Sequence, residues 1–187
     1  MDHERLVRLL AERSTRRGRF TLASGRESTL YVDCRLTTMS PDGLSLIGPL
    51  GLRTIREAGW DAQSVGGLTL GADPVAYAIS YASALDRPSV RAFTVRKEAK
   101  QHGTGKVIEG PFQVGDRVVV VEDVITTGGS AQRAAEAVRA AGGTVIGVLA
   151  VCDREEGGRE TLERDGLVVR ALTRLSEIVG MLPPAVE

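Results

Sequence analysis

The sequence has few cysteines, no excess of charge of either sign and no long apolar run. Its two cysteines, Cys34 and Cys152, lie far apart and have no partner at metal-ligand spacing, so we expect reduced packing residues. Lys and Arg together number 24, as do Asp and Glu, which argues against a general nucleic-acid-binding protein. No apolar stretch approaches the roughly 20 residues that span a bilayer. Neither a nucleic-acid partner nor a membrane is therefore expected.

The length and the amino terminus predict a cytoplasmic protein of one domain. A chain of 187 residues fits one domain of roughly 100–200 residues, so we expect residues 1–187 to fold together. The beginning, MDHERLVRLLAERS, is amphipathic and acidic from its second residue. A secretory signal instead has a basic start followed by an apolar block.

Predicted strands and helices alternate along most of the chain. Ser40-Pro41 and Asp73-Pro74 are signals for helix starts, with the first residue as N-cap and proline at the first helical position. Segment 19–33 predicts two short strands joined by a Ser24-Gly25 turn, and residues 97–116 predict a long loop. The other predicted strands are 64–71, 89–96, 117–123, 144–153 and 167–173, and the predicted helices are 3–14, 41–58, 73–86, 130–142 and 176–182.

This order of elements predicts an α/β fold. The central strands are continuous apolar runs, which are typical of strands buried on both faces of a mainly parallel sheet flanked by helices. Residues 1–40 do not follow the alternation. We expect them, together with the C-terminal end, to form a small hood over the core.

The segment from Val118 to Ser130, VVVVEDVITTGGS, joins a buried strand to a helix through acids and glycines. Ligands of open parallel sheets bind at the carboxyl ends of the strands, where Glu122 and Asp123 are expected. The turn TTGGS can direct backbone N–H groups at an anion, and the helix that follows adds its positive end. Phosphate beside carboxylates that accept hydroxyl groups predicts a ribose 5-phosphate ligand. The alternative is that the acids only cap the next helix.

Other nucleotide motifs are missing from the sequence. No G-x-x-x-x-G-K-[ST] is present, and no G-x-G-x-x-G follows a strand. These absences argue against a P-loop nucleotidase and against a dinucleotide-binding fold.

A second group of candidate residues lies in the predicted loop. Five basic or imidazole side chains fall within eleven residues among glycines, namely Arg96, Lys97, Lys100, His102 and Lys106. Such a loop can close over a highly charged substrate and stabilise a leaving group whose negative charge grows in the transition state. The alternative is an ordinary solvated basic loop.

Several stretches of the sequence resemble those of a known family. VVVVEDVITTGGS is similar to the motif by which type I phosphoribosyltransferases bind 5-phosphoribosyl 1-pyrophosphate (PRPP). Three further stretches, FTLASGRES, RKEAKQHGTGKVIEG and CDREEGG, resemble the orotate phosphoribosyltransferases of that family. The likeness extends over almost the whole chain in the expected order.

The resemblance implies an activity and a set of site residues. It implies transfer of the phosphoribosyl group from PRPP to orotate, with Mg²⁺ carried mainly by PRPP, no protein metal site, and a homodimer with shared active sites. Lys100 and His102 would be catalytic, and Thr126 and Arg154 would contact orotate. The implied PRPP-binding residues are Arg96, Lys97, Lys100, His102, Glu122, Asp123, Val124, Ile125, Thr126, Thr127, Gly128, Gly129 and Ser130.

Two alternative functions stay open, and the sequence departs from some relatives at a few positions. The chain could be a PRPP-dependent transferase for another nucleobase, or a PRPP-sensing regulator that keeps the fold without the chemistry. Glu122 stands where many relatives have Asp, and Ala23 where some have Lys. Some relatives also have a basic residue near GLTLGADP, where this chain has Asp73. An arginine such as Arg154 would, without the family likeness, be expected at the surface, paired with Glu155 or Glu156.

Overall fold

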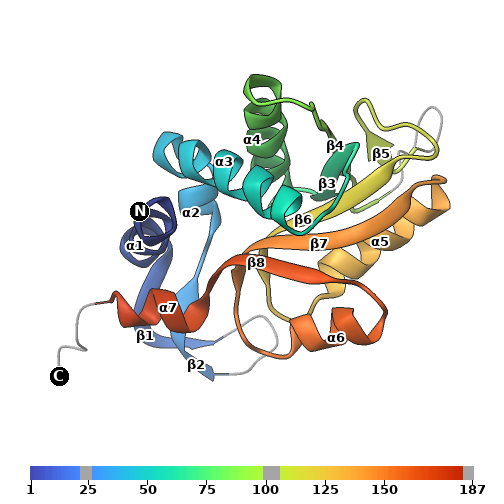
Figure 1. Ribbon diagram of the computed structural model, residues 1–187. Coiled ribbons are helices and arrows are strands. Elements are labelled where there is room, and N and C mark those ends of the chain that lie inside the picture. Colours follow the sequence, from blue (N-terminus) through green and yellow to red (C-terminus); the bar gives the residue numbers. More distant parts are fainter. Residues whose placement is uncertain (22–26, 99–105, 183–187) are drawn as a thin grey trace.

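The computed structural model describes residues 1–21, 27–98 and 106–182. Its centre is a six-stranded sheet with the strand order β5-β4-β3-β6-β7-β8 (Figure 1). Neighbouring strands are parallel except for the antiparallel pair β4 and β5. This confirms the predicted α/β fold with a mainly parallel sheet. The strands are β3 (Ser64–Leu68), β4 (Arg91–Val95), β5 (Ile108–Glu109), β6 (Arg117–Ile125), β7 (Thr144–Asp153) and β8 (Val169–Arg174).

Helices cover both faces of the sheet, as the apolar strands predict. Side chains alternate along β6, so Val119 and Val121 join one hydrophobic core while Val118 and Val120 join the other. All four valines are fully buried, and each contributes about 1.5–3 kcal/mol by leaving water. On the first face lie α3 (Pro41–Glu57) and α4 (Ala72–Leu85), and on the second lie α5 (Gly129–Ala140) and α6 (Gly158–Arg164) (Figure 1).

The described residues among the first 40 lie together with the last helix at one side of the sheet (Figure 1). They comprise α1 (Asp2–Ser14), the antiparallel pair β1 (Thr15–Thr21) and β2 (Glu27–Val32), α2 (Arg35–Thr38) and α7 (Leu175–Gly180). We refer to these elements as the hood. Leu6 and Leu10 of α1 are buried in the same core as Ile178 of α7, so the hood is packed onto the main sheet. The Ser24-Gly25 turn lies outside the described residues.

Both cysteines are free and buried, as expected. Cys34 follows β2 in the hood, whereas Cys152 lies near the end of β7, and both belong to the core between the hood and the sheet. Within the described part of the chain, no helix is long and apolar enough to cross a membrane.

Several local predictions differ from the structure. The predicted N-cap Ser40 accepts a hydrogen bond from the Gly43 N–H at 3.1 Å, which confirms the start of α3. The predicted N-cap Asp73 is wrong: Gly71 is the cap, and Asp73 lies inside the first turn of α4, where its carboxylate accepts bonds from two threonine hydroxyls. The predicted loop 97–116 contains the short strand β5, and α2 and α6 were not predicted.

Candidate active site

The end of β6 and the start of α5 form a small polar cavity. The predicted strand 117–123 continues to Ile125, where it still pairs with β7, and α5 begins at Gly129 after a short turn. The turn lines a cavity of about 230 Å³ together with Glu122 and residues 124–131. Gly128 caps the helix with a φ of 85°, a left-handed conformation that favours glycine. The structure therefore places residues 126–130 around one opening at the positive end of a helix, as an anion cradle requires.

Glu122 is a buried acid at the edge of this cavity. Its side chain is 5% exposed, and its Oε1 has no hydrogen-bond partner among the described residues. Burial raises the pKa of Glu122 to about 8, and the neighbouring charge of Asp123 adds to the rise, while Arg133 opposes it. An unpartnered carboxyl oxygen next to the cavity is a ready acceptor for a ligand hydroxyl.

Asp123 has a different surrounding at the same strand end. Burial raises its pKa as well, but the Val124 N–H donates to its Oδ1 at 2.9 Å and the charge of Arg35 acts in the opposite direction. Gly71 lies so close that a Cβ added there would be 2.5 Å from Asp123 Oδ1. The loop after β3 therefore packs directly against the second carboxylate.

A larger cavity of about 300 Å³ joins the hood to this strand end. It shares Glu122, Val124 and Ser130 with the smaller cavity, so the two cavities adjoin at Glu122. Its walls are residues 31–35 of the hood, residues 68–71, Lys97, residues 122–124, Ser130 and Arg133. A ligand that fills the small cavity can thus extend past the carboxylates toward the hood.

Asp73 supports the loop between these walls. Its carboxylate accepts hydrogen bonds from Thr69 Oγ1 at 2.7 Å and from Thr94 Oγ1 at 2.8 Å. Thr94 Oγ1 also shares a hydrogen bond of 2.9 Å with the Tyr77 hydroxyl. The Asp73 carboxylate therefore ties the loop after β3 to β4 and α4.

The basic segment is only partly described. Lys97 lies on the wall of the larger cavity, as a lid residue would. Arg96 is turned toward Glu109 of β5, with 3.5 Å between Nη1 and Oε1. Lys100 and His102, the implied catalytic residues, lie outside the described residues, as does Ala23.

Arg154 lies beyond the end of β7, apart from the walls of the two cavities given above. Its backbone N–H donates to the Ile125 carbonyl, which links it to the end of β6. Only 9% of the side chain is exposed; Nη2 is 2.8 Å from Glu156 Oε1, and Nε is buried with no partner among the described residues. Arg154 is thus a mostly buried arginine with an unused donor. Thr126, in contrast, lines the small cavity.

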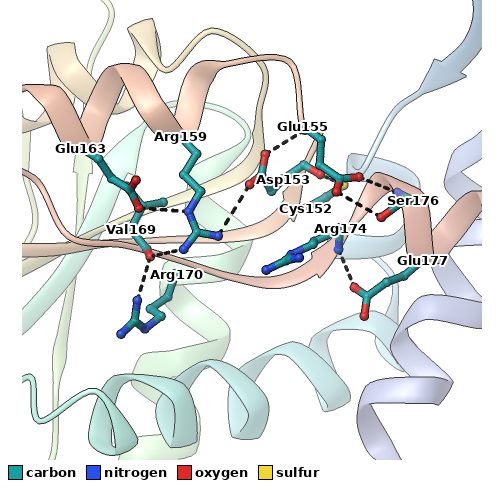
Figure 2. Close-up of polar contacts among 10 residues, drawn as sticks. All are labelled: Cys152, Asp153, Glu155, Arg159, Glu163, Val169, Arg170, Arg174, Ser176 and Glu177. Atoms are coloured by element: carbon teal, nitrogen blue, oxygen red, sulfur yellow. Dashed lines mark hydrogen bonds and ion pairs between the residues drawn. The ribbon is translucent and has the colours of Figure 1, made fainter.

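The turn that carries Arg154 is held by its neighbours (Figure 2). Glu155 has a φ of 57°, which is unusual for a residue with a side chain. Its carboxylate accepts bonds from the Ser176 backbone N–H at 2.8 Å and from the Ser176 hydroxyl at 3.1 Å, and its own N–H donates to Asp153. Arg159 of α6 contacts Asp153 and Glu163 in turn (Figure 2). Contacts to α6 and α7 therefore shape this turn.

The predicted site omits the hood residues 31–35 and Arg133, which line the larger cavity. One signal for the hood residues is present in the sequence. Asp33 comes directly after β2, so it also marks an acidic strand end, as Glu122 and Asp123 do near the end of β6. Arg133 follows the glycine turn within the first turns of α5.

Comparison with known proteins agrees with this geometry. Residues 64–180 match the phosphoribosyl transferase domain family. The chain is 47% identical over 182 residues to the orotate phosphoribosyltransferase of Aquifex aeolicus, covering 96% of this chain and 98% of that one. It is 48% identical over 179 residues to that of Mycobacterium tuberculosis, covering 95% and 96%.

Solved structures show the same likeness. The crystal structure of Mycobacterium tuberculosis orotate phosphoribosyltransferase in complex with PRPP aligns with a TM-score of 0.81 and 42% identity, covering 96% of this chain and 99% of that chain. The complex of that enzyme with Fe(III) dicitrate gives a TM-score of 0.85 and 46% identity, covering 95% and 99%. The chain therefore belongs to the phosphoribosyltransferase family and, within it, to the orotate phosphoribosyltransferases.

Proposed function

We propose that the chain transfers the 5-phosphoribosyl group of PRPP to orotate, which yields orotidine 5′-phosphate and pyrophosphate in pyrimidine synthesis. One observation carries the assignment of the site. A small polar cavity at the start of α5 adjoins a larger cavity beneath the hood, and two carboxylates of raised pKa lie where the two meet. A ligand with a phosphate at one end, ribose hydroxyls in the middle and a reacting centre at the other end suits that order.

The 5′-phosphate is assigned to residues 126–130. The backbone N–H groups at the start of α5 have no partner within the helix, and the helix dipole favours an anion there. The ribose hydroxyls are assigned to Glu122 and Asp123, because the oxygens of a carboxyl group accept hydrogen bonds from hydroxyls. Bound hydroxyls would satisfy the unpartnered Glu122 Oε1. Val124 and Ile125 would then shape the floor between the phosphate and the sugar.

The pyrophosphate end is assigned to the basic segment. In the reaction a ring nitrogen of orotate forms a bond to C1′, the bond from C1′ to the pyrophosphate oxygen breaks, and the nitrogen loses its proton. Negative charge grows on the departing pyrophosphate, so cations there stabilise the transition state more than the ground state. Lys97 already lines the larger cavity. Arg96, Lys100 and His102 complete this proposal, the last two as the catalytic residues.

Mg²⁺ fits the same place. It prefers hard oxygen ligands and retains several waters, so PRPP oxygens would supply most of its coordination. Glu122 and Asp123 are the carboxylates at this edge, and a nearby cation would favour their ionised forms. When bound, Mg²⁺ would neutralise charge on the pyrophosphate. Among the described residues, no group of three or more His, Cys, Asp and Glu side chains could hold a metal ion.

Orotate is assigned to Thr126 and Arg154. A guanidinium matches the orotate carboxylate in a bidentate pair. The buried Arg154 Nε is a donor that such a ligand would satisfy. Because Nη2 is bound to Glu156, this role requires the side chain to share or exchange that partner.

A homodimer with shared active sites is part of the proposal. Three large side chains at four-residue spacing, Tyr77, Tyr81 and Leu85, form an exposed stripe along α4, with 54%, 70% and 74% of each exposed. Leu70, which lines the larger cavity, is 55% exposed and lies just before the N-terminal end of α4. A second copy of the chain packed there would bury this stripe next to the active site.

One assay tests the assignment. The protein is incubated with PRPP and Mg²⁺ and with orotate, uracil, adenine or hypoxanthine in turn, and pyrophosphate release is measured. We expect release with orotate alone. Pyrophosphate release with a different base would favour a transferase for that base. Tight PRPP binding without pyrophosphate release with any base would favour a PRPP-sensing regulator.

A further inference from the structure

Arg35 lies on the wall of the larger cavity but outside the PRPP motif, the basic segment and the turn of Arg154. With the 5′-phosphate at residues 126–130 and the ribose at Glu122 and Asp123, this cavity receives the reacting end of the substrate. That end carries the diphosphate, and the incoming base carries a carboxylate. In this placement, the cationic side chain of Arg35 faces the anionic oxygens of the diphosphate or of the carboxylate.

The guanidinium of Arg35 is held by one edge. Its Nε donates to Asp33 Oδ1 at 2.8 Å and its Nη2 to Oδ2 at 2.9 Å, a bidentate pair. A guanidinium has five N–H donors in one plane. The pair with Asp33 uses two of them, so three donors are left, and two of these lie along the Nη1–Nη2 edge, where a second oxyanion can approach.

The support beneath Arg35 is rigid. The Asp33 N–H donates to the Ser14 carbonyl at 2.8 Å, which fixes the end of β2 against the end of α1. The Arg35 N–H also donates to Asp33 Oδ1, at 3.1 Å. Between them, Cys34 is 1% exposed and packs in the core. An arginine fixed in this way loses little conformational freedom when it binds a ligand.

The charge of Arg35 already acts on the site. It opposes the rise in the pKa of Asp123, the proposed ribose acceptor. The hydrogen bond to Asp33 raises the pKa of Arg35, and the charge of Asp123 adds to that rise. Half of the Arg35 side chain is exposed, compared with 17% of Asp33. The arginine is therefore the accessible partner of the pair, and the aspartate is its support.

We propose that Arg35, held by Asp33, binds an anionic oxygen at the reacting end of the substrate, either in the diphosphate of PRPP or in the carboxylate of orotate. Asp33 is a positioning residue in this arrangement, because it acts through Arg35. The proposal rests on the function proposed above and adds to it a substrate contact from the hood. In this arrangement, residues of the N-terminal hood form one wall of the active site.

The test compares Arg35→Gln, Arg35→Lys and Asp33→Asn with the control Arg53→Gln. Arg53 is an exposed arginine on α3 that forms a 4.0 Å ion pair with Glu57 and does not line the larger cavity, so its loss removes a cation without touching the cavity. Initial rates with varied orotate and varied PRPP, and calorimetry of PRPP binding with Mg²⁺, are measured for each. We expect Arg35→Gln to weaken one substrate about 10- to 100-fold, the usual range for a hydrogen bond to a charged group. Arg35→Lys should weaken the same substrate less than Arg35→Gln does, and so should Asp33→Asn.

Each outcome decides the proposal. A raised orotate KM with native PRPP affinity assigns the contact to the carboxylate, and a lowered PRPP affinity assigns it to the diphosphate. The proposal is overturned if the Arg35 variants melt at the native temperature and have the same KM values and PRPP affinity as Arg53→Gln. If Arg35→Gln does not fold, Arg35→Lys decides alone, and native constants in it count against the contact. If the native protein releases no pyrophosphate, the proposed function fails, and the PRPP affinities of the same variants still test Arg35.

Discussion

Replacing Glu122 by glutamine should make the free protein more stable at neutral pH. In the folded chain burial raises the pKa of Glu122 from an ordinary value of 4.5 to about 8. Between these values the folded protein holds a proton that the unfolded chain has lost. Stability therefore falls as the pH rises through this window, by about 1.4 kcal/mol per pH unit.

The magnitude follows from the width of the window. Full ionisation of Glu122 lowers the free energy of unfolding by about 5 kcal/mol, of which about 3 kcal/mol already applies at pH 7. Glutamine has nearly the same shape and does not titrate. The stability of the variant should therefore not fall in this way as the pH rises. The difference in the free energy of unfolding between the variant and the native protein should shrink toward zero near pH 4.5.

Urea unfolding of both proteins at several values between pH 5 and pH 8 measures the effect. Through Glu122 alone, the native free energy of unfolding should drop by about 3–4 kcal/mol over that range relative to the variant. Glu136→Gln, which removes an exposed carboxyl from α5, is the control and should follow the native curve. Parallel curves for native protein and Glu122→Gln would refute the reasoning. The same variant should bind PRPP with Mg²⁺ more weakly, because the bound cation would favour the ionised form of Glu122 and glutamine cannot supply that charge.

Three further predictions follow from the site. Gly128→Ala should lower the free energy of unfolding by at least about 1–2 kcal/mol in urea titration, because φ is 85° and the new Cβ would lie 2.9 Å from the Gly158 carbonyl; native stability would contradict the tight turn. Arg154→Ala should raise the orotate KM in initial-rate measurements while calorimetric PRPP affinity survives, and an unchanged KM would remove Arg154 from the base site. Mixing inactive Lys100→Ala and Asp123→Ala proteins should restore about one quarter of native activity, since random exchange makes about half of the dimers mixed, each with one intact site. No recovery after exchange verified by mass would reject the shared site.

The part of the site that lies within one segment was predictable from the sequence. The strand end at Glu122, the glycine turn and the start of α5 are consecutive, so local chemistry alone indicates a phosphate cradle. The larger cavity is different, because it joins hood residues 31–35 to a strand end about 90 positions later in the chain. No spacing in the sequence expresses that contact.

Short elements escaped prediction for a related reason. β5 has two residues, and α6 has seven with Leu162 as its one buried large apolar side chain, so neither can show a hydrophobic period. Asp73 was mistaken for a helix cap because its sequence context fits one. Its actual partners include Thr94, which lies 21 positions away on β4.

The two buried cysteines give the protein an internal probe of hood movement. Cys34 comes from the hood and Cys152 from β7, and both lie in the core between them. A hydrogen bond with Cys152, together with burial, holds the pKa of Cys34 well above its ordinary value. An alkylating reagent needs an accessible thiolate, so it can react only after the hood has separated from the sheet. Because the chain has two cysteines in all, the rate of thiol loss, with and without substrate, reports the free energy of that opening directly, with no label added.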